Sequence, residues 1–261
     1  MFFFYIIILE IHENQVSLNM AVINKINVAN NFLSFRGITT TQERKSYISP
    51  TISLLKSPDR DLFIPSKRSF FSDPEIRDAV IFAIQKHDGK YRKHPTKKIP
   101  YVTHCINVGE KLQKAGFGKD TVIAGILHDT VEDTDTTYKE LEDKFGQRVS
   151  RLVQEVSHSK KNVSWEEKQI SYLKHIQHAS IDAQAISAFD KIDNMNSSIE
   201  CLEEGLNIFA NMKATPKKQL KKWNNLRKVY DQTNIPDEIK QEYRDTFEKL
   251  CVLTAQNHFL Y

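Results

Sequence analysis

A short acidic sequence directly follows an apolar segment in the middle of the chain. Residues His128–Asp133 read His-Asp-Thr-Val-Glu-Asp, and Val122–Leu127 before them contains no polar side chain. Burying such charges is unfavourable unless a cation or hydrogen bonds compensate. Imidazole and carboxylate together suit Mn²⁺, Fe²⁺ or Zn²⁺ better than Ca²⁺. The pattern predicts metal ligands at His128 and Asp129, with the two later carboxylates facing the bound water. A solvated helix end is the alternative.

Polar residues at two other places add candidate ligands. His104 stands near the start of a helix predicted over residues 102–115. Asp190, Asp193 and Asn194 interrupt a later apolar helix at helix-neighbour spacing. Taken alone, His104 is typical of a surface or hydrogen-bonded histidine, and Asp190 of an ordinary amphipathic face. His104 and Asp190 are therefore only candidate ligands to add to the His-Asp pair.

The order of these residues (histidine, His-Asp pair, aspartate) resembles the signature of the HD superfamily. The surrounding motifs are more specific and resemble the hydrolase domain of RelA/SpoT-type proteins. They are His87-x-Gly89-x-x-Arg92-Lys93, Pro100-Tyr101-x-x-His104, Leu127-His128-Asp129-x-Val131-Glu132-Asp133-Thr134 and Phe145-Gly146. The layout is similar to that of the free-standing small alarmone hydrolases, over roughly residues 75 to 200.

This resemblance implies an all-helical domain that binds one Mn²⁺ and removes the 3′-pyrophosphate from (p)ppGpp, giving GDP or GTP and pyrophosphate. The metal ligands that it implies are His104, His128, Asp129 and Asp190. The acidic pair that it assigns to positioning or deprotonating the attacking water is Glu132 and Asp133. The substrate contacts that it implies are Arg92 and Lys93 at the phosphates and Asn194 near the nucleotide.

Three positions depart from the family's pattern. Ser187 stands where the family usually carries lysine, and Asp193 where it often carries histidine or tyrosine. Cys105 replaces the proline that follows the first ligand. No ligand is lost, but the first two departures change the charge around the nucleotide. The alternatives are therefore hydrolysis of another phosphorylated nucleotide, or a degenerate domain that binds nucleotide for regulation without cleaving it.

Helices must position these residues, and the hydrophobic period is helical almost throughout from Ser72 onward. Ser72–Glu75 is typical of a helix start, Thr137 and Glu140 predict a capping box, and the basic segment 87–100 is typical of a loop. Further helices are predicted at 147–158, 164–178, 181–196, 199–213, 216–232 and 236–255. The lysine-rich run Lys217–Lys228 is interpreted as a solvated helix face. The fold class is all-α, an HD-domain helical bundle.

Composition sets the remaining bounds. The 261 residues, 40% hydrophobic and 27% charged, predict one domain over residues 71–261 after an irregular extension over residues 1–70. The net charge of +4 permits anionic ligands without requiring nucleic acid. The three cysteines form no CxxC pair, which excludes a thiolate zinc site or disulfide framework and favours a reducing compartment.

The N-terminal segment decides the predicted location. Met1–Leu9 is apolar but too short to span a bilayer, and it lacks the features of a secretory signal. The stretch after Met20 weakly resembles an organelle transit peptide. We expect a cytoplasmic protein that acts on a small-molecule nucleotide, with no nucleic-acid or membrane partner. Organelle targeting by the N-terminal arm is the alternative, and the oligomeric state and the start methionine stay open.

Overall fold

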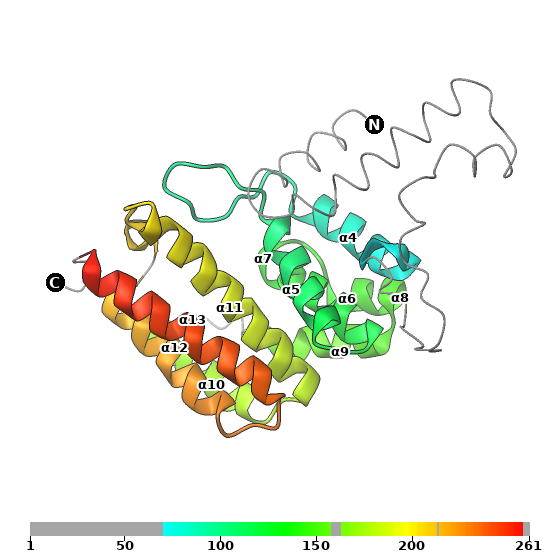
Figure 1. Ribbon diagram of the computed structural model, residues 1–261. Helices are drawn as coiled ribbons and strands as arrows, with labels where there is room; N and C mark the ends of the chain where they lie inside the picture. Colours follow the sequence, from blue (N-terminus) through cyan, green and yellow to red (C-terminus); the bar gives the residue numbers. More distant parts are fainter. Residues whose placement is uncertain (1–69, 158–162, 213, 258–261) are drawn as a thin grey trace, which may run out of the picture. The chain divides into compact units, whose positions relative to one another are not determined.

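The computed structural model describes residues 70–157, 163–212 and 214–257 (Figure 1). They belong to one compact unit, Arg68–Tyr261. Phe70 begins a short 3-10 helix, η1 (Phe70–Ser72). The rest of the predicted extension, including its possible targeting segment, lies outside the described residues.

All regular elements of the described residues are helical, which confirms the all-α prediction. Extended backbone pairs there only in an isolated bridge between Tyr91 and Pro100, within the predicted loop. The helices are α4 (Pro74–Lys86), α5 (Val102–Lys114), α6 (Lys119–Leu127), α7 (Thr130–Asp133), α8 (Tyr138–Phe145), α9 (Gln147–Val156), α10 (Trp165–Gln177), α11 (Ile181–Glu203), α12 (Pro216–Tyr230) and α13 (Asp237–Gln256). In the parts of the chain that the structure describes, none has the length and apolar character needed to cross a membrane.

Local side-chain hydrogen bonds explain where two of these helices begin. Asp73 caps α4 by accepting from the backbone N–H of Glu75 at 2.9 Å, and proline occupies the first helical position. Thr137 caps α8 by accepting from the N–H of Glu140 at 3.1 Å. The side chain of Glu140 contacts Lys86 at 3.3 Å. Both predicted helix starts are confirmed, and Thr137 forms its half of the predicted capping box.

One long helix, α11, replaces two predicted helices. The prediction of a break between residues 196 and 199 is wrong, since α11 continues to Glu203 and a 3-10 helix, η2 (Ile208–Asn211), follows. Ser198 donates its hydroxyl to the carbonyl of Asn194 at 3.0 Å, within the helix. Buried Ile199 and Leu202 continue the apolar stripe past the predicted break. The chain turns only at Gly205, whose φ of 72° favours glycine.

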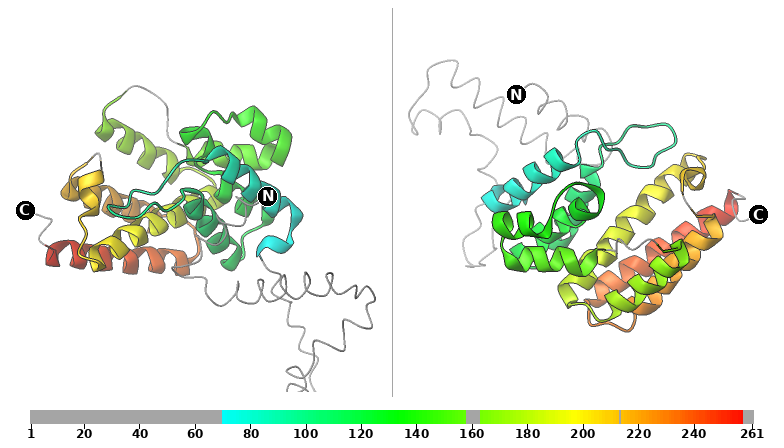
Figure 2. Two further views of the ribbon diagram at one scale, coloured as in Figure 1. Left: turned by 90° about the horizontal axis from the view of Figure 1, so that it is seen from above. Right: turned by 180° about the vertical axis from the view of Figure 1, so that it is seen from behind.

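The position of α11 brings distant parts of the sequence together. It contacts α12 and α13 near the C-terminus and also α5, α6 and α9. Figures 1 and 2 show α11 between the C-terminal helices and the group formed by α5, α6 and α9. Buried side chains from these helices form a continuous core that includes Leu112, Ile126, Leu127, Ile192, Met195, Tyr230 and Leu250. Polar residues in the middle of α11 therefore face the helices that carry His104 and His128.

Glycine allows α5 and α6 to approach closely. A Cβ atom on Gly109 of α5 would lie 2.6 Å from Cγ1 of Ile126 on α6. Real Cβ atoms do not approach a carbon this closely, so a side chain at this position would push the two helices apart. This contact fixes the spacing between the helix that carries His104 and the helix that leads to His128.

Substituting Gly109 with valine is expected to lower the free energy of unfolding by about 1–3 kcal/mol through overpacking. Urea denaturation of both proteins measures the change. Gly118→Val is a matched control, because nothing lies within 4 Å of the Cβ position of Gly118 and its φ of −64° suits valine. Equal midpoints for the two variants would contradict this account of the helix contact.

Candidate metal centre

Three buried side chains from different helices meet at one point. His104 comes from the first turn of α5, His128 directly follows α6, and Asp190 comes from the middle of α11. One potential ligand atom from each lies within 4.8 Å of the others. His104 Nε2 is 3.3 Å from both His128 Nε2 and Asp190 Oδ1. Ligands on one ion lie roughly 3–3.5 Å apart when bonds are about 2.1 Å long, so the cluster has suitable dimensions.

Asp129, the fourth predicted ligand, lies beside this cluster. Its Oδ2 is 3.1 Å from His128 Nε2 and 3.6 Å from His104 Nε2. The same oxygen accepts a hydrogen bond of 2.5 Å from the hydroxyl of Tyr101, the residue before α5. The structure thus brings all four sequence-predicted ligands to one place.

Hydrogen bonds on the far side of each ring orient the two histidines. His128 Nδ1 donates to the carbonyl of Gly125 at 2.8 Å, and His104 Nδ1 donates to Asp193 Oδ2 at 2.6 Å. Each Nε2 is then left to present its lone pair to the cluster. At 3.3 Å the two Nε2 atoms have room between them for a shared proton or, when both rings are deprotonated, for a cation that both lone pairs bind. This donor arrangement fits a divalent metal ion.

The electrostatics of the cluster also favour positive charge. Burial disfavours the charged ring of His128, but the charge of Asp129 and its hydrogen bond outweigh burial and raise the pKa of His128 to about 9. Burial would raise the pKa of Asp190, but Lys191 and the two histidines outweigh it and keep this pKa well below its usual range. The carboxylates therefore stay ionised, as metal ligands must.

The two predicted catalytic carboxylates lie on α7, the shortest α-helix among the described residues. Asp129 precedes α7, and its carbonyl accepts from the N–H of Asp133 at 2.9 Å. Glu132 is half-buried and Asp133 is exposed at the end of α7. Partial desolvation, followed by the charge of Asp129, raises the pKa of Asp133. A carboxyl group with a raised pKa is a better proton acceptor near neutral pH.

Two of the three predicted substrate-binding residues contact each other. The Arg92 guanidinium donates to Asn194 Oδ1 at 3.2 Å and to Asp193 Oδ2 at 3.0 Å. Asn194 in turn donates to Asp190, so that Arg92 is connected to the cluster. Lys93 is exposed in the same loop, and the structure gives it no direct contact with the cluster. Of the three predicted substrate-binding residues, Arg92 and Asn194 are thus joined to the cluster by hydrogen bonds.

Ser187, the first departure from the family pattern, belongs to a buried hydroxyl network. Its hydroxyl lies 2.6 Å from the hydroxyl of Tyr172 and 2.7 Å from that of Tyr230. One turn later, buried Lys191 pairs with Asp190 and lies 5.3 Å from the centre of the Tyr172 ring. A neutral network thus occupies the place where the family carries a lysine.

Sequence reasoning missed Lys222, which the lysine-rich run seemed to assign to solvent. Lys217, Lys218, Lys221 and Lys228 are exposed as interpreted, but Lys222 is half-buried. Burial, followed by the charge of Lys191, lowers the pKa of Lys222 to about 8, and Lys93, Asp190 and Glu132 also act on it. Lys222 therefore lies within electrostatic range of Asp190 and Glu132. Its one-turn spacing from buried Gln219 and Leu226 was the available signal.

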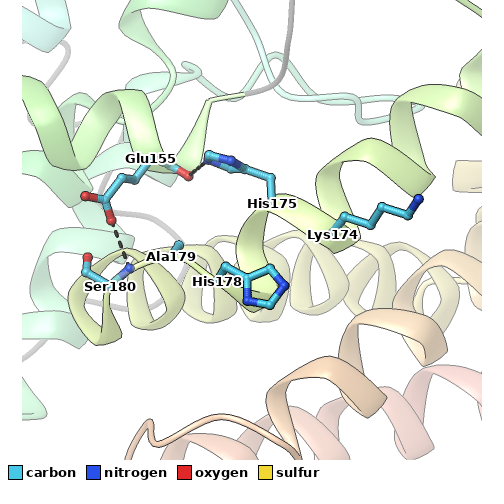
Figure 3. A pocket seen from close by; sticks show the side chains of 6 residues that line it. All are labelled: Glu155, Lys174, His175, His178, Ala179 and Ser180. Carbon is cyan, nitrogen blue, oxygen red and sulfur yellow. Dashed lines mark hydrogen bonds between the residues drawn. The ribbon is translucent and has the colours of Figure 1, made fainter.

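A separate surface pocket lies away from these residues, where α9, α10 and the start of α11 meet (Figure 3). Its lining residues are Glu155, Lys174, His175, His178, Ala179 and Ser180. Glu155 accepts from the backbone N–H of Ser180 at 2.9 Å, and its carbonyl accepts from His175 at 2.8 Å. These bonds join three helices, and none of the predicted site residues lines this pocket.

Comparison with known proteins identifies the relatives of this chain. The family model described as "HD domain" matches residues 79–220. The guanosine-3′,5′-bis(diphosphate) 3′-pyrophosphohydrolase MESH1 of Xenopus tropicalis is 39% identical over 132 residues, covering 50% of this chain and 73% of that protein. The guanosine-3′,5′-bis(diphosphate) 3′-pyrophosphohydrolase of Aquifex aeolicus is 39% identical over 125 residues, which cover 47% of this chain and 18% of the longer relative.

A solved structure agrees with these relatives. A metazoan ortholog of SpoT, whose description states that it hydrolyses ppGpp, superposes with a TM-score of 0.58 at 25% identity. The match covers 69% of this chain and 98% of the other. The matched family region, residues 79–220, contains every member of the cluster described above. The chain belongs to the HD-domain family and is a homologue of the MESH1 and SpoT-type proteins.

Proposed function

We propose that this chain is a Mn²⁺-dependent phosphohydrolase that removes the 3′-pyrophosphate from (p)ppGpp, leaving GDP or GTP. The observation that carries the proposal is the buried cluster of His104, His128 and Asp190, with Asp129 beside it. The names of the relatives support the substrate, since MESH1 and the Aquifex aeolicus protein are both guanosine-3′,5′-bis(diphosphate) 3′-pyrophosphohydrolases.

His104, His128, Asp129 and Asp190 would hold the metal ion. When bound, a divalent ion supplies Lewis acidity and makes water more acidic. A mixed set of imidazole and carboxylate ligands suits Mn²⁺, although Fe²⁺ and Zn²⁺ use similar sets. Tyr101 and Gly125 keep Asp129 and His128 in place through the hydrogen bonds described above.

Glu132 and Asp133 are proposed to accept the proton of the attacking water. They follow the ligand Asp129 within one helical turn, and the raised pKa of Asp133 favours proton transfer near neutral pH. Arg92 is proposed to bind the substrate phosphates together with Lys93 and Lys222, and Asn194 to contact the nucleotide. These cations would stabilise the phosphoryl charge during cleavage of the bond to the 3′ oxygen.

Lys222→Met is expected to raise KM for ppGpp about tenfold with a smaller change in kcat, because one charge-assisted contact to the substrate phosphates is lost. Initial rates over a range of ppGpp concentrations measure both constants. Lys221→Met is the matched control. Lys221 is the exposed neighbour of Lys222 on α12, so its substitution should leave KM unchanged. Unchanged KM in both variants would contradict this role and would show that the solvated-face interpretation holds for both lysines.

Hydrolysis of another phosphorylated nucleotide is the second candidate, and the neutral network at Ser187 favours it. A panel of ppGpp, GDP, GTP and a 3′-phosphorylated adenine nucleotide, each with Mn²⁺, separates the two candidates. The main proposal expects pyrophosphate from ppGpp and no reaction with GDP or GTP. Orthophosphate as the main product, or faster turnover of the adenine nucleotide, would favour the second candidate.

We also propose that residues 71–261 form the hydrolase domain and residues 1–70 a separate extension. The substrate is a small nucleotide, and neither a nucleic acid nor a membrane is needed as a partner. All three cysteines (Cys105, Cys201 and Cys251) are free. Free cysteines are usual in a reducing compartment such as the cytoplasm, which supports that location.

A further inference from the structure

Asp193, the second departure from the family pattern, lies between two parts of the proposed site. It is buried on α11, and both of its carboxylate oxygens accept hydrogen bonds. Oδ2 accepts from His104 Nδ1 at 2.6 Å and from Arg92 at 3.0 Å, while Oδ1 accepts from the Asn107 amide at 3.0 Å. All three partners donate, which is the pattern that an ionised carboxylate requires.

The first contact concerns the metal ligand. With Nδ1 donating to Asp193, His104 presents the lone pair of Nε2 to His128 and Asp190, each 3.3 Å away. A carboxylate behind a metal-binding histidine fixes the ring orientation and makes it a stronger ligand. His128 has only the neutral carbonyl of Gly125 in the same role. Asp193 is therefore the charged partner behind this pair of ligands.

The second contact concerns the substrate side. The side chain of Arg92 is only 8% exposed, and its guanidinium is divided between Asp193 and Asn194. Arg92 belongs to the loop before α5, whereas both acceptors lie on α11. The Asp193 carboxylate therefore holds this loop residue at the cluster.

We propose that Asp193 is a positioning residue that orients His104 for the metal ion and Arg92 for the substrate phosphates through one shared carboxylate. The half that concerns Arg92 rests on the proposed function. The half that concerns His104 rests only on metal binding. The departure from the family pattern at this position thereby couples metal affinity to substrate binding.

Asp193→Asn tests this role, because asparagine keeps the size of the side chain and removes its charge. The oxygen of the new amide can still accept from His104 and Arg92. If the Asn107 amide rotates, the N–H of the new amide can donate to the Asn107 oxygen. We expect Mn²⁺ to bind about 10–100-fold more weakly to metal-free protein, measured by electron paramagnetic resonance of free Mn²⁺. At saturating Mn²⁺, KM for ppGpp should also rise about tenfold.

Two single variants separate positioning from general damage. Arg92→Ala should raise KM and leave Mn²⁺ affinity unchanged, so only the Asp193 variant should change both. Asp182→Asn makes the same substitution on α11 at the surface pair with Arg148 and should change neither. If Asp193→Asn fails to fold, Asn107→Asp combined with Asp193→Asn keeps a carboxylate-amide pair and moves the charge away from His104. That double variant should show the same loss of Mn²⁺ affinity.

Mn²⁺ affinity within twofold of the wild-type value in a folded Asp193 variant would overturn the role at His104. Unchanged KM together with weakened Mn²⁺ binding would overturn the shared role with Arg92. Wild-type protein that binds Mn²⁺ but leaves ppGpp intact would refute the proposed function instead. The metal titrations would still decide the role of Asp193 at His104 in that case.

Discussion

Asp129→Asn is expected to abolish Mn²⁺ binding and to lower kcat/KM for ppGpp by about 1,000-fold or more. The amide carries no charge, so the variant loses the electrostatic attraction that Asp129 would offer a cation. Several kcal/mol of transition-state stabilisation depend on the metal ion, and each 1.4 kcal/mol is about tenfold in rate. Metal analysis of the purified protein and steady-state kinetics measure the two losses.

Asp135→Asn provides the control for this experiment. Asp135 follows α7 in the same segment, but its side chain is 87% exposed, and its ion pair among the described residues is with half-buried Lys86, at 3.0 Å. Exposed pairs contribute little to stability, so this variant should keep full activity and metal content. An Asp129 variant with wild-type metal content would refute the assignment of Asp129 as a ligand.

Replacing both Glu132 with glutamine and Asp133 with asparagine is expected to lower kcat by about 100- to 10,000-fold while Mn²⁺ still binds. The double variant is needed because either carboxylate can serve as the proton acceptor when the other is lost. Single-turnover kinetics with Mn²⁺-loaded protein measures the chemical step. Retained metal with lost turnover distinguishes these residues from the ligands, whose loss removes both.

The pH dependence gives a second measure of the same role. Only the ionised form of Asp133 accepts a proton, so kcat should fall as the pH falls through its pKa. Desolvation and the charge of Asp129 raise that pKa, which moves the acid limb above the range of an ordinary aspartate. Asp133→Asn alone should displace this limb. A double variant with kcat within threefold of the wild-type value would exclude a role for both carboxylates.

Local sequence signals predicted the helices well because their causes are local. The side chains of Asp73 and Thr137 cap α4 and α8 by accepting from neighbouring backbone N–H groups, and the structure contains both caps. The single error of consequence is the break predicted near residues 196–199. There, Ile199 and Leu202 are buried and α11 continues past the predicted end. The local sequence around residues 196–199 does not show which helices will pack there.

The candidate site likewise combines residues that local sequence signals indicate with residues that only tertiary packing brings together. His128 and Asp129 stand out because they follow a buried apolar helix, but Asp190 is an ordinary helix residue until packing brings α11 to α5. Its selection depended on the family resemblance. The contacts of Asp193 with His104 and Arg92 span 89 and 101 residues. No spacing rule predicts such contacts, and the burial of Lys222 likewise depends on which helices pack beside it.

The most direct test of the central claim is a Mn²⁺ titration of metal-free protein with ppGpp as substrate. Ion-exchange chromatography follows GDP and pyrophosphate, while metal binding is measured in parallel. We predict that equal amounts of GDP and pyrophosphate appear as each chain binds one Mn²⁺, and that Asp129→Asn gives neither product. Protein that binds Mn²⁺ with His104, His128 and Asp190 intact, yet releases no pyrophosphate from ppGpp, would contradict the account.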